Sequence, residues 1–230
     1  MKLHEVLRRL GQVIVGSKAT PSDDSLDSWN LKDYGYETRK ALALGYLLGL
    51  AEKSFQNNPQ AIAVECGVGR GWSLGVILIG TDVDVVGFDS FQGFPPSSSE
   101  DRDNFVPSAK YAQLSPSYVR ENLRGAGIEE EKIERLTLIE GFFSESLAKV
   151  STGVGFVHLD VDLYSSYREC LESLFPWLIP GAVVTFDEYD LGRDTEKWPG
   201  AKVAIDEFVL QKDLELLRHP TGYVYFQIPL

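Results

Sequence analysis

The sequence alternates between short apolar runs and longer amphipathic stretches over most of its length. The short runs are rich in valine, isoleucine and other apolar residues, as expected of strands buried on both faces of a sheet. The longer stretches repeat apolar residues at intervals of three and four, which predicts helices with one buried face. The runs predicted as strands are 61–66, 83–88, 136–139, 155–159 and 182–186.

Helices are predicted before, between and after these strands. Residues 39–53 have the strongest helical pattern, with several leucines on one side. The helix after the fourth strand is expected to begin near Ser166 and Glu169, which have the spacing of a capping box. Pro180 and Gly181 are expected to end the connection from this helix to the fifth strand. The other predicted helices cover 3–15, 74–79, 116–126 and 201–210.

The chain ends with two further strand-like runs, 214–218 and 223–228, separated by a short loop that contains proline and glycine. This pattern predicts an antiparallel hairpin at one edge of the sheet. We therefore expect an α/β fold in which a mostly parallel sheet lies between two layers of helices and ends in an antiparallel hairpin strand.

Two polar segments accompany the predicted sheet. Residues 1–38 are expected to form an N-terminal helix and a lid or linker, followed by a single domain over residues 39–230. The second polar segment, 92–110, contains three prolines and is long enough to have a function of its own. The aromatic residues of both segments are suited either to stacking on a bound ring or to packing within a lid: Trp29, Tyr34, Tyr36 and Phe105.

Composition narrows the possible partners. With 230 residues, 43% of them hydrophobic, the chain is large enough for one such domain with a substantial core. Its formal net charge of −12 argues against nucleic acid as a partner, because phosphate-binding surfaces are basic. Cys66 and Cys170 lie in apolar patterns and predict buried free thiols, which suit a reducing compartment. No apolar run approaches the ~20 residues of a spanning helix, so we expect a cytoplasmic protein without membrane partners.

A glycine-rich turn follows the first predicted strand and precedes a helix. It reads Glu65-Cys-Gly67-Val-Gly69-Arg-Gly71. Glycines at such a turn let the backbone approach a ligand at a strand end and a helix N-terminus. Asp89 ends the second strand, 22 residues past Gly67, where a carboxylate can accept hydrogen bonds from a ribose.

These features fit both a nicotinamide-binding protein and a class I methyltransferase. A dinucleotide fingerprint needs a third glycine at its sixth position, where this chain has Trp72. Glu65 would repel a pyrophosphate, but it suits the positive charges of S-adenosylmethionine. The methyltransferase is therefore the favoured hypothesis, and a nicotinamide-dependent oxidoreductase is the alternative.

Acidic residues follow the fourth and fifth predicted strands. Neighbouring strand ends lie about 5 Å apart, so Asp160, Asp187 and Glu188 are expected to converge. Converging carboxylates repel one another unless a cation joins them, and a hard divalent ion is the natural choice. In the alternative interpretation these acids are solvated, or Asp160 or Asp162 caps the next helix. His158 lies inside a strand and is expected in the core.

With these motifs the sequence resembles the macrocin O-methyltransferase (TylF) family, whose members methylate sugar hydroxyls on antibiotics and related natural products. The resemblance runs from about Tyr36 to the C-terminus, and it implies a three-layer, Rossmann-like class I methyltransferase sheet of seven strands. The segments that carry it are VECGVGRGWS, VVGFDSFQGFPP, FVHLDVDLYSS, GAVVTFDEYD and WPGAKVAIDEF.

The resemblance also implies which residues form the site. Magnesium would be bound by Asp160, Asp187 and Glu188. Family members usually have tryptophan where this chain has Gly69. They usually have aspartate where it has Glu188, and the longer glutamate side chain implies a different geometry at the metal site. The residues implied for S-adenosylmethionine are Glu65, Gly67, Gly69, Gly71 and Ser73 near the methionine part, Asp89 at the ribose, Ser90, Gly141 and Phe142 at the adenine, and Asp160.

The expected activity is metal-dependent transfer of a methyl group from S-adenosylmethionine to a hydroxyl of a sugar or other small natural product. Asp160 or Asp162 is the candidate base, and Asp162 is the freer of the two if Asp160 binds the metal. A catechol-like phenol is an alternative acceptor, and a binding protein without catalysis is a second alternative. The family resemblance favours a homodimer.

Overall fold

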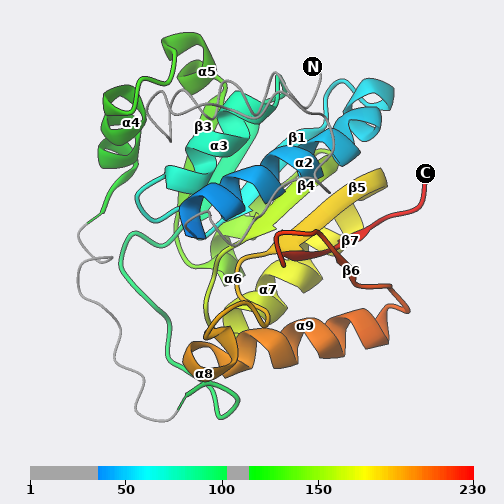
Figure 1. Ribbon diagram of the computed structural model, residues 1–230. Helices are drawn as coiled ribbons and strands as arrows, with labels where there is room; N and C mark the ends of the chain where they lie inside the picture. Colours follow the sequence, from blue (N-terminus) through cyan, green and yellow to red (C-terminus); the bar gives the residue numbers. More distant parts are fainter. Residues whose placement is uncertain (1–35, 103–113) are drawn as a thin grey trace.

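The computed structural model describes residues 36–102 and 114–230, which form a seven-stranded sheet covered by helices (Figure 1). The strands are β1 (Ile62–Cys66), β2 (Val85–Asp89), β3 (Leu136–Glu140), β4 (Val154–Leu159), β5 (Leu178–Phe186), β6 (Leu217–Arg218) and β7 (Val224–Gln227). Their order across the sheet is β3-β2-β1-β4-β5-β7-β6. The first five strands pair in parallel, β7 is antiparallel to β5, and β6 is antiparallel to β7. The predicted α/β sheet with an antiparallel C-terminal hairpin is confirmed.

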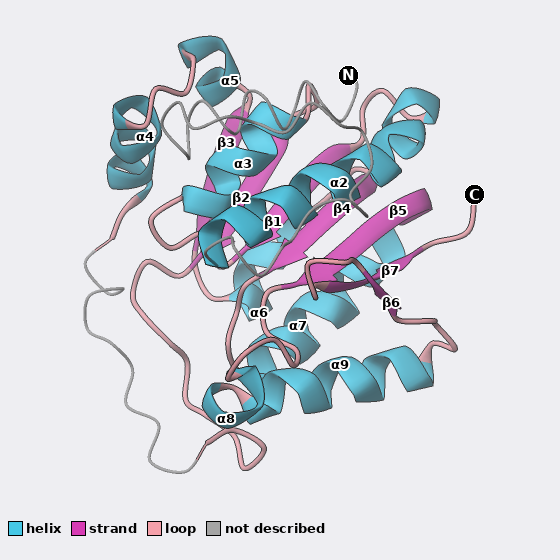
Figure 2. Cartoon of the chain, viewed as in Figure 1, coloured by secondary structure: helices cyan, strands magenta, loops and turns pink. Residues whose placement is uncertain are grey.

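Helices lie on both faces of this sheet (Figure 2). One face carries α2 (Tyr36–Asn57), α3 (Trp72–Gly80), α4 (Pro116–Gly125) and α5 (Glu130–Glu134). The other carries α6 (Phe143–Ser146), the 3₁₀ turn η4 (Leu147–Lys149), α7 (Tyr164–Leu174) and α9 (Pro199–Gln211). The short η5 (Phe175–Trp177) and α8 (Asp194–Lys197) follow α7 and precede α9 in the chain.

The central strand β4 shows how the two faces share the core. All its residues are buried, as the apolar run predicts for a parallel strand inside the sheet. Its side chains alternate between the layers, so that Phe156 packs with α2 and α3 whereas Val157 and Leu159 pack with α7 and α9. Each fully buried Val, Leu or Phe contributes about 1.5–3 kcal/mol relative to an exposed one.

The N-terminus of α7 differs from the prediction. The helix begins at Tyr164, so Ser166 lies inside it and is buried, and the predicted capping box is wrong. A residue distant in sequence takes over: Oδ1 of Asp101 accepts the Tyr164 amide at 2.9 Å. Gly200 at the start of α9 leaves room for this carboxylate, because an added Cβ would lie 2.1 Å from Asp101 Oδ1.

The start of β5 also differs from the prediction. Pro180 and Gly181 do not precede the strand but lie within it, since β5 begins at Leu178. The register between β4 and β5 shifts between Val154 and Phe156, and Gly181 has a φ of 80°. Such an irregularity accommodates proline and glycine, which a regular central strand does not.

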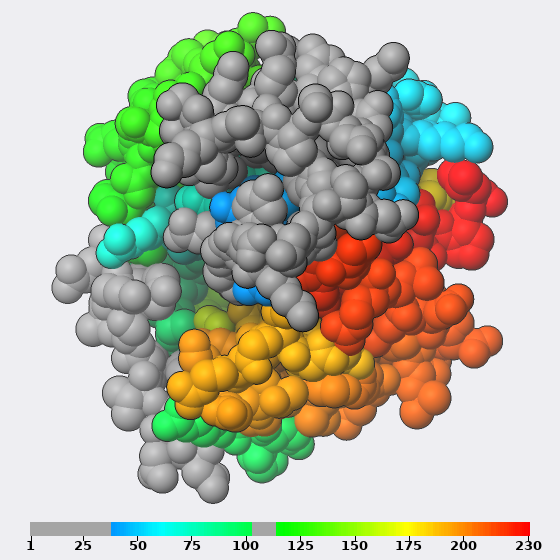
Figure 3. Space-filling model, viewed as in Figure 1, coloured from blue at the N-terminus to red at the C-terminus, as the bar shows by residue number. Residues whose placement is uncertain are grey.

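Several predictions concern residues outside the described ranges: the helix at 3–15, nearly all of the lid within 1–38, and Phe105. The described part of the 92–110 segment packs near α8, where the rings of Phe94 and Trp198 stack with centroids 6.5 Å apart. From α8 to β6, the C-terminal part of the chain forms a continuous surface on the face shown in Figure 3. Within residues 36–102 and 114–230, no helix is long and apolar enough to cross a membrane.

Candidate active site

A cavity of about 830 Å³ lies at the carboxyl ends of the parallel strands. This size is typical of small-molecule sites, and open α/β sheets bind ligands at this edge. Glu65 and Gly71 do not line the cavity. The predicted site residues that do line it are Gly67, Gly69, Ser73, Asp89, Ser90, Gly141, Phe142, Asp160, Asp162, Asp187 and Glu188.

The glycine turn after β1 has a structural reason that sequence reasoning missed. Gly67 has a φ of 84°, and a Cβ there would lie 1.8 Å from the backbone oxygen of Asp160. A Cβ on Gly71, with a φ of 85°, would lie 2.8 Å from Cγ1 of Val119. Both glycines are therefore required by packing inside the protein, whatever their contribution to ligand binding.

Asp89 ends β2, as predicted, and faces the cavity. Its Oδ2 accepts the Gly69 amide at 2.9 Å and its Oδ1 accepts the Phe91 amide at 2.8 Å. Burial raises the pKa of Asp89, although these amides oppose the shift. A carboxylate has about four acceptor positions, and the backbone amides use only part of them. The orientation of Asp89 is thus fixed while acceptor capacity remains for a ligand.

Ser90, Gly141 and Phe142 border the same part of the cavity. The Ser90 hydroxyl donates to the backbone oxygen of Gly93 at 2.6 Å. Gly141 has a φ of 132° and donates its amide to the backbone oxygen of Asp89 at 3.0 Å. The loops after β2 and β3 are therefore tied together, and the partly exposed ring of Phe142 stands beside them.

Glu65 and His158 form a fully buried pair behind the cavity wall. They face each other in the register of β1 and β4, with Glu65 Oε1 2.8 Å from His158 Nδ1. Burial raises the pKa of Glu65, and the contact with His158 opposes this shift. Glu65 Oε2 and His158 Nε2 have no hydrogen-bond partner within the described part of the chain. The core position expected for His158 is confirmed, and direct contact between Glu65 and a cofactor stays a prediction.

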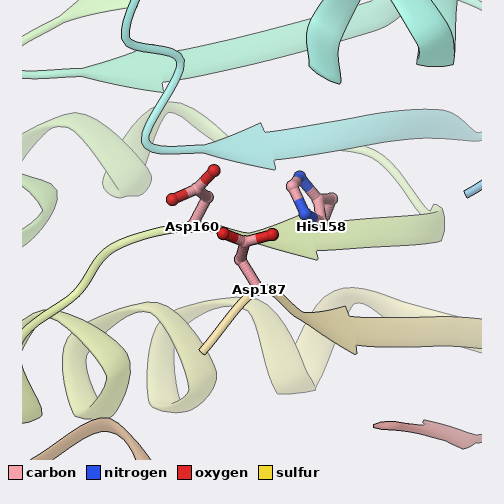
Figure 4. Close-up of side chains that lie close together, drawn as sticks. All are labelled: His158, Asp160 and Asp187. Atoms are coloured by element: carbon pink, nitrogen blue, oxygen red, sulfur yellow. The ribbon is translucent and has the colours of Figure 1, made fainter. Parts of the chain in front are cut away.

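The acids after β4 and β5 gather in two groups. One contains His158, Asp160 and Asp187, and the other contains Asp160, Asp162 and Glu188, with the ligand atoms of each group within 4.8 Å of one another. Figure 4 shows the first group at the ends of the two strands. Successive residues of an extended chain point to opposite faces, which separates Asp187 from Glu188. The predicted set of Asp160, Asp187 and Glu188 is thus divided between the two groups.

Lys40 of α2 is a site residue that the sequence analysis did not identify. Its Nζ lies 2.6 Å from Asp160 Oδ2 and 2.8 Å from Asp187 Oδ1, and the residue is only 5% exposed. Burial lowers the pKa of Lys40, but the two carboxylates outweigh this effect and hold it well above its ordinary value. The sequence does indicate that Lys40 is buried, because its spacing places it on the same face of the helix as the buried Leu44 and Leu47.

The second acid group faces α7. The Tyr167 hydroxyl donates to Glu188 Oε2 at 2.6 Å, and the Asp162 amide lies 3.4 Å from the same oxygen. Burial, followed by the neighbouring carboxylates, raises the pKa of both Asp162 and Glu188 well above the ordinary range. Asp162 has a φ of 61°, an uncommon conformation for a residue with a side chain. Such backbone strain persists where the surroundings enforce it, and functional sites are the usual places.

The strand order, the helical layers and the cavity at the sheet edge define a Rossmann-like methyltransferase fold. The O-methyltransferase NovP has the same fold, with a TM-score of 0.70 and 21% identity over 99% of this chain and 98% of that one. The calicheamicin methyltransferase CalS11 is also similar, with a TM-score of 0.67 and 23% identity over 97% of this chain and 91% of that one.

Sequence similarity identifies the family to which the chain belongs within this fold. The model of the macrocin-O-methyltransferase (TylF) family matches residues 47–217, and the chain belongs to this family. A relative from Streptomyces olivaceus, the 8-demethyl-8-(2,3-dimethoxy-alpha-L-rhamnosyl)-tetracenomycin-C 4'-O-methyltransferase, is 32% identical over 107 residues. That alignment spans 44% of this chain and 40% of the relative.

Proposed function

We propose that the protein is an S-adenosylmethionine-dependent O-methyltransferase that acts on a hydroxyl of a sugar or another small natural product. Family membership supports the class of reaction. The observation that carries the proposal is that one cavity joins Asp89 and the glycine turn, on one side, to the acids after β4 and β5, on the other. Methyl transfer needs this arrangement, because the cofactor and the acceptor must meet in line.

The residues at β1, β2 and β3 fit the cofactor. Asp89 is oriented by two backbone amides and retains acceptor capacity for a ribose diol. Phe142 presents a partly exposed ring, suited to the edge or face of a base. S-adenosylmethionine, when bound, supplies a methyl group already activated by the positive sulfur.

Asp162 is the proposed base for the acceptor hydroxyl. Its side chain belongs to the cavity wall, whereas the carboxylate of Asp160 is engaged by Lys40 at 2.6 Å. The Asp162 amide contacts Glu188 Oε2 at 3.4 Å, and the residue has the uncommon φ of 61°. A base must lie within hydrogen-bond reach of the hydroxyl, and Asp162 takes no part in the two ion pairs that Lys40 forms with Asp160 and Asp187.

The predicted magnesium dependence has less support in this chain than the proposed methyl transfer. The three predicted ligands do not form one group, and an ammonium lies between two of them. The residues therefore do not fit the predicted magnesium site, and the proposed reaction contains no step that requires a metal. The proton of the acceptor hydroxyl passes to a carboxylate of the cavity wall.

The charge of the cavity favours an acceptor without phosphate groups. Acidic residues outnumber basic ones in the wall, and the whole chain has a net charge of −12. Residues 1–35 and 103–113 contain equal numbers of acidic and basic residues and so add no net charge. The name of the Streptomyces olivaceus relative likewise describes a rhamnosyl group on tetracenomycin. The ionisable wall residues are Lys40, Arg70, Asp89, Glu145, Asp160, Asp162, Glu169, Asp187 and Glu188.

The first test is calorimetric titration with S-adenosylmethionine and S-adenosylhomocysteine. We expect micromolar binding of both, weakened about 10-fold or more in Asp89→Ala because charged hydrogen bonds are lost. Glu131→Ala, an exposed acid on α5, is the matched control and should bind normally. Absence of binding by the wild-type protein, together with quenching of NADH fluorescence, would instead support the nicotinamide alternative. A screen of neutral glycosides and catechols then separates the two acceptor classes.

A further inference from the structure

Lys40 occupies the position in the acid cluster where a free cation would be expected. Its ammonium contacts Asp160 and Asp187, which directly follow β4 and β5, and these contacts are 2.6 and 2.8 Å long. The side chain reaches this point from α2, on the face of the sheet opposite α7 and Glu188. The two carboxylates therefore already share a cation that the protein carries itself.

His158 completes a donor set around this position. Its ligand atom lies within 4.8 Å of those of Asp160 and Asp187. An ionised Glu65 only accepts hydrogen bonds, so its contact with His158 assigns the histidine proton to Nδ1 and leaves a lone pair on Nε2. Nε2 is buried and has no hydrogen-bond partner among the residues the structure describes. A carboxylate that orients a histidine in this way is the usual support of a metal-bound imidazole.

We infer that Lys40 is the resident cation of the group formed by His158, Asp160 and Asp187, and that it keeps divalent ions out of this group. Lys40 thereby acts as a positioning residue, which holds Asp160 and Asp187 at fixed places under the cavity. A tethered ammonium competes with any free ion at a high effective concentration. Removal of the charge converts the group into a site with one imidazole and two carboxylates, which suits Mn²⁺.

The test compares Mn²⁺ binding, measured by electron paramagnetic resonance, in the wild-type protein and in Lys40→Met. We expect binding to become at least tenfold tighter in the variant, because the buried carboxylate of Asp187 and the partly exposed carboxylate of Asp160 lose their counter-ion and gain a vacant ligand position. The double variant Lys40→Met/Asp187→Asn should lose this gain, which assigns the new site to Asp187. Equal or weaker Mn²⁺ binding by Lys40→Met overturns the inference.

Two controls separate the effect from a general change in charge. Lys202→Met removes a lysine that pairs with Asp206 on α9, and it should leave Mn²⁺ binding unchanged. Lys40→Arg keeps a cation in the cluster and should bind Mn²⁺ no more tightly than the wild-type protein. Thermal unfolding provides a second measurement: Mn²⁺ should stabilise Lys40→Met more than the wild-type protein, because ligands stabilise the state that binds them.

The wild-type protein alone also tests the inference, whether or not Lys40→Met folds. We expect it to bind Mn²⁺ only weakly, with a Kd above about 100 μM, since a bound ion must displace or accommodate the ammonium. Tight binding that Asp187→Asn abolishes would overturn the inference and would support the family-derived metal site. This inference rests on the proposed function, because it concerns the acid cluster of the proposed active site. The Mn²⁺ measurements and the S-adenosylhomocysteine titration are independent, so the inference and the proposed function can fail separately.

Discussion

The carboxylate of Glu65 and the imidazole of His158 meet across β1 and β4, with Oε1 2.8 Å from Nδ1 and both side chains fully buried. Glu65→Gln keeps an oxygen that can accept the histidine proton but removes the charge. We expect the free energy of unfolding to fall by about 1–3 kcal/mol, as for other weakened buried hydrogen bonds to charged groups.

Denaturant unfolding and S-adenosylhomocysteine calorimetry on the same variant separate two roles of Glu65. If the residue acts through His158, cofactor affinity should change less than threefold while stability falls. A tenfold loss of affinity at unchanged stability would show instead that Glu65 contacts the cofactor, as the family resemblance implies.

Gly67→Ala should destabilise the protein strongly. The added Cβ would lie 1.8 Å from the backbone oxygen of Asp160, so the turns after β1 and β4 must move apart. We expect a loss of more than about 3 kcal/mol, and the displaced Asp160 should weaken the site as well. Gly127→Ala is the matched control, because Gly127 has a similar φ of 82° and open space around its Cα. Backbone strain alone should cost about 1 kcal/mol there, and equal losses in both variants would contradict the packing argument.

Asp162→Asn should lower turnover by about 10²–10⁴-fold, the usual contribution of a positioned base. Calorimetry should find cofactor affinity within a few-fold of the wild-type value, because Asp162 is not among the predicted cofactor contacts. Glu169→Gln, which alters another acid of the cavity wall, serves as the control. Near-normal turnover in Asp162→Asn would assign the proton to a different group.

Acceptors with the same sugar should be methylated at different rates depending on whether they carry phosphate groups. A neutral glycoside should react at least ten times more efficiently than the same sugar linked to a nucleoside diphosphate, because the acidic wall repels the phosphates. The comparison of kcat/KM should be made at low and high salt. A preference for the nucleotide-linked sugar at both salt concentrations would show that the described wall does not select the acceptor.

His219 should make the protein less stable in mild acid. Burial lowers its pKa from 6.5 to about 4, and its Nδ1 accepts the Thr221 amide at 3.3 Å. Between pH 6.5 and 4, His219 is protonated in the unfolded chain but stays neutral in the folded protein. The free energy of unfolding therefore decreases as the pH falls through this window. At pH 5 the loss is about 2 kcal/mol at most. Urea unfolding at pH 7 and pH 5 should show a smaller difference in His219→Gln; an unchanged difference would exclude this histidine as the cause.

The sequence by itself determined the alternation of strands and helices, the antiparallel end of the sheet and the edge of the sheet at which the cavity lies. These features depend on local periodicity, since the spacing of apolar residues shows which of them must be buried. It also identified Asp89 and the acids after β4 and β5, because strand ends in a parallel sheet gather functional residues. Element ends were less accurate: α2 extends from Tyr36 to Asn57 and not only over 39–53.

Only the tertiary structure decided which of these residues meet. Asp187 and Glu188 are neighbours in sequence, yet the pleat turns one toward Lys40 and the other toward Tyr167. The contact between Lys40 and Asp160 joins residues 120 positions apart, and the cap that Asp101 gives α7 also comes from a distant segment. Local spacing carries no information on such pairs, because the packing of helices on the sheet brings them together. The charge balance of the acid cluster is therefore a property of the fold.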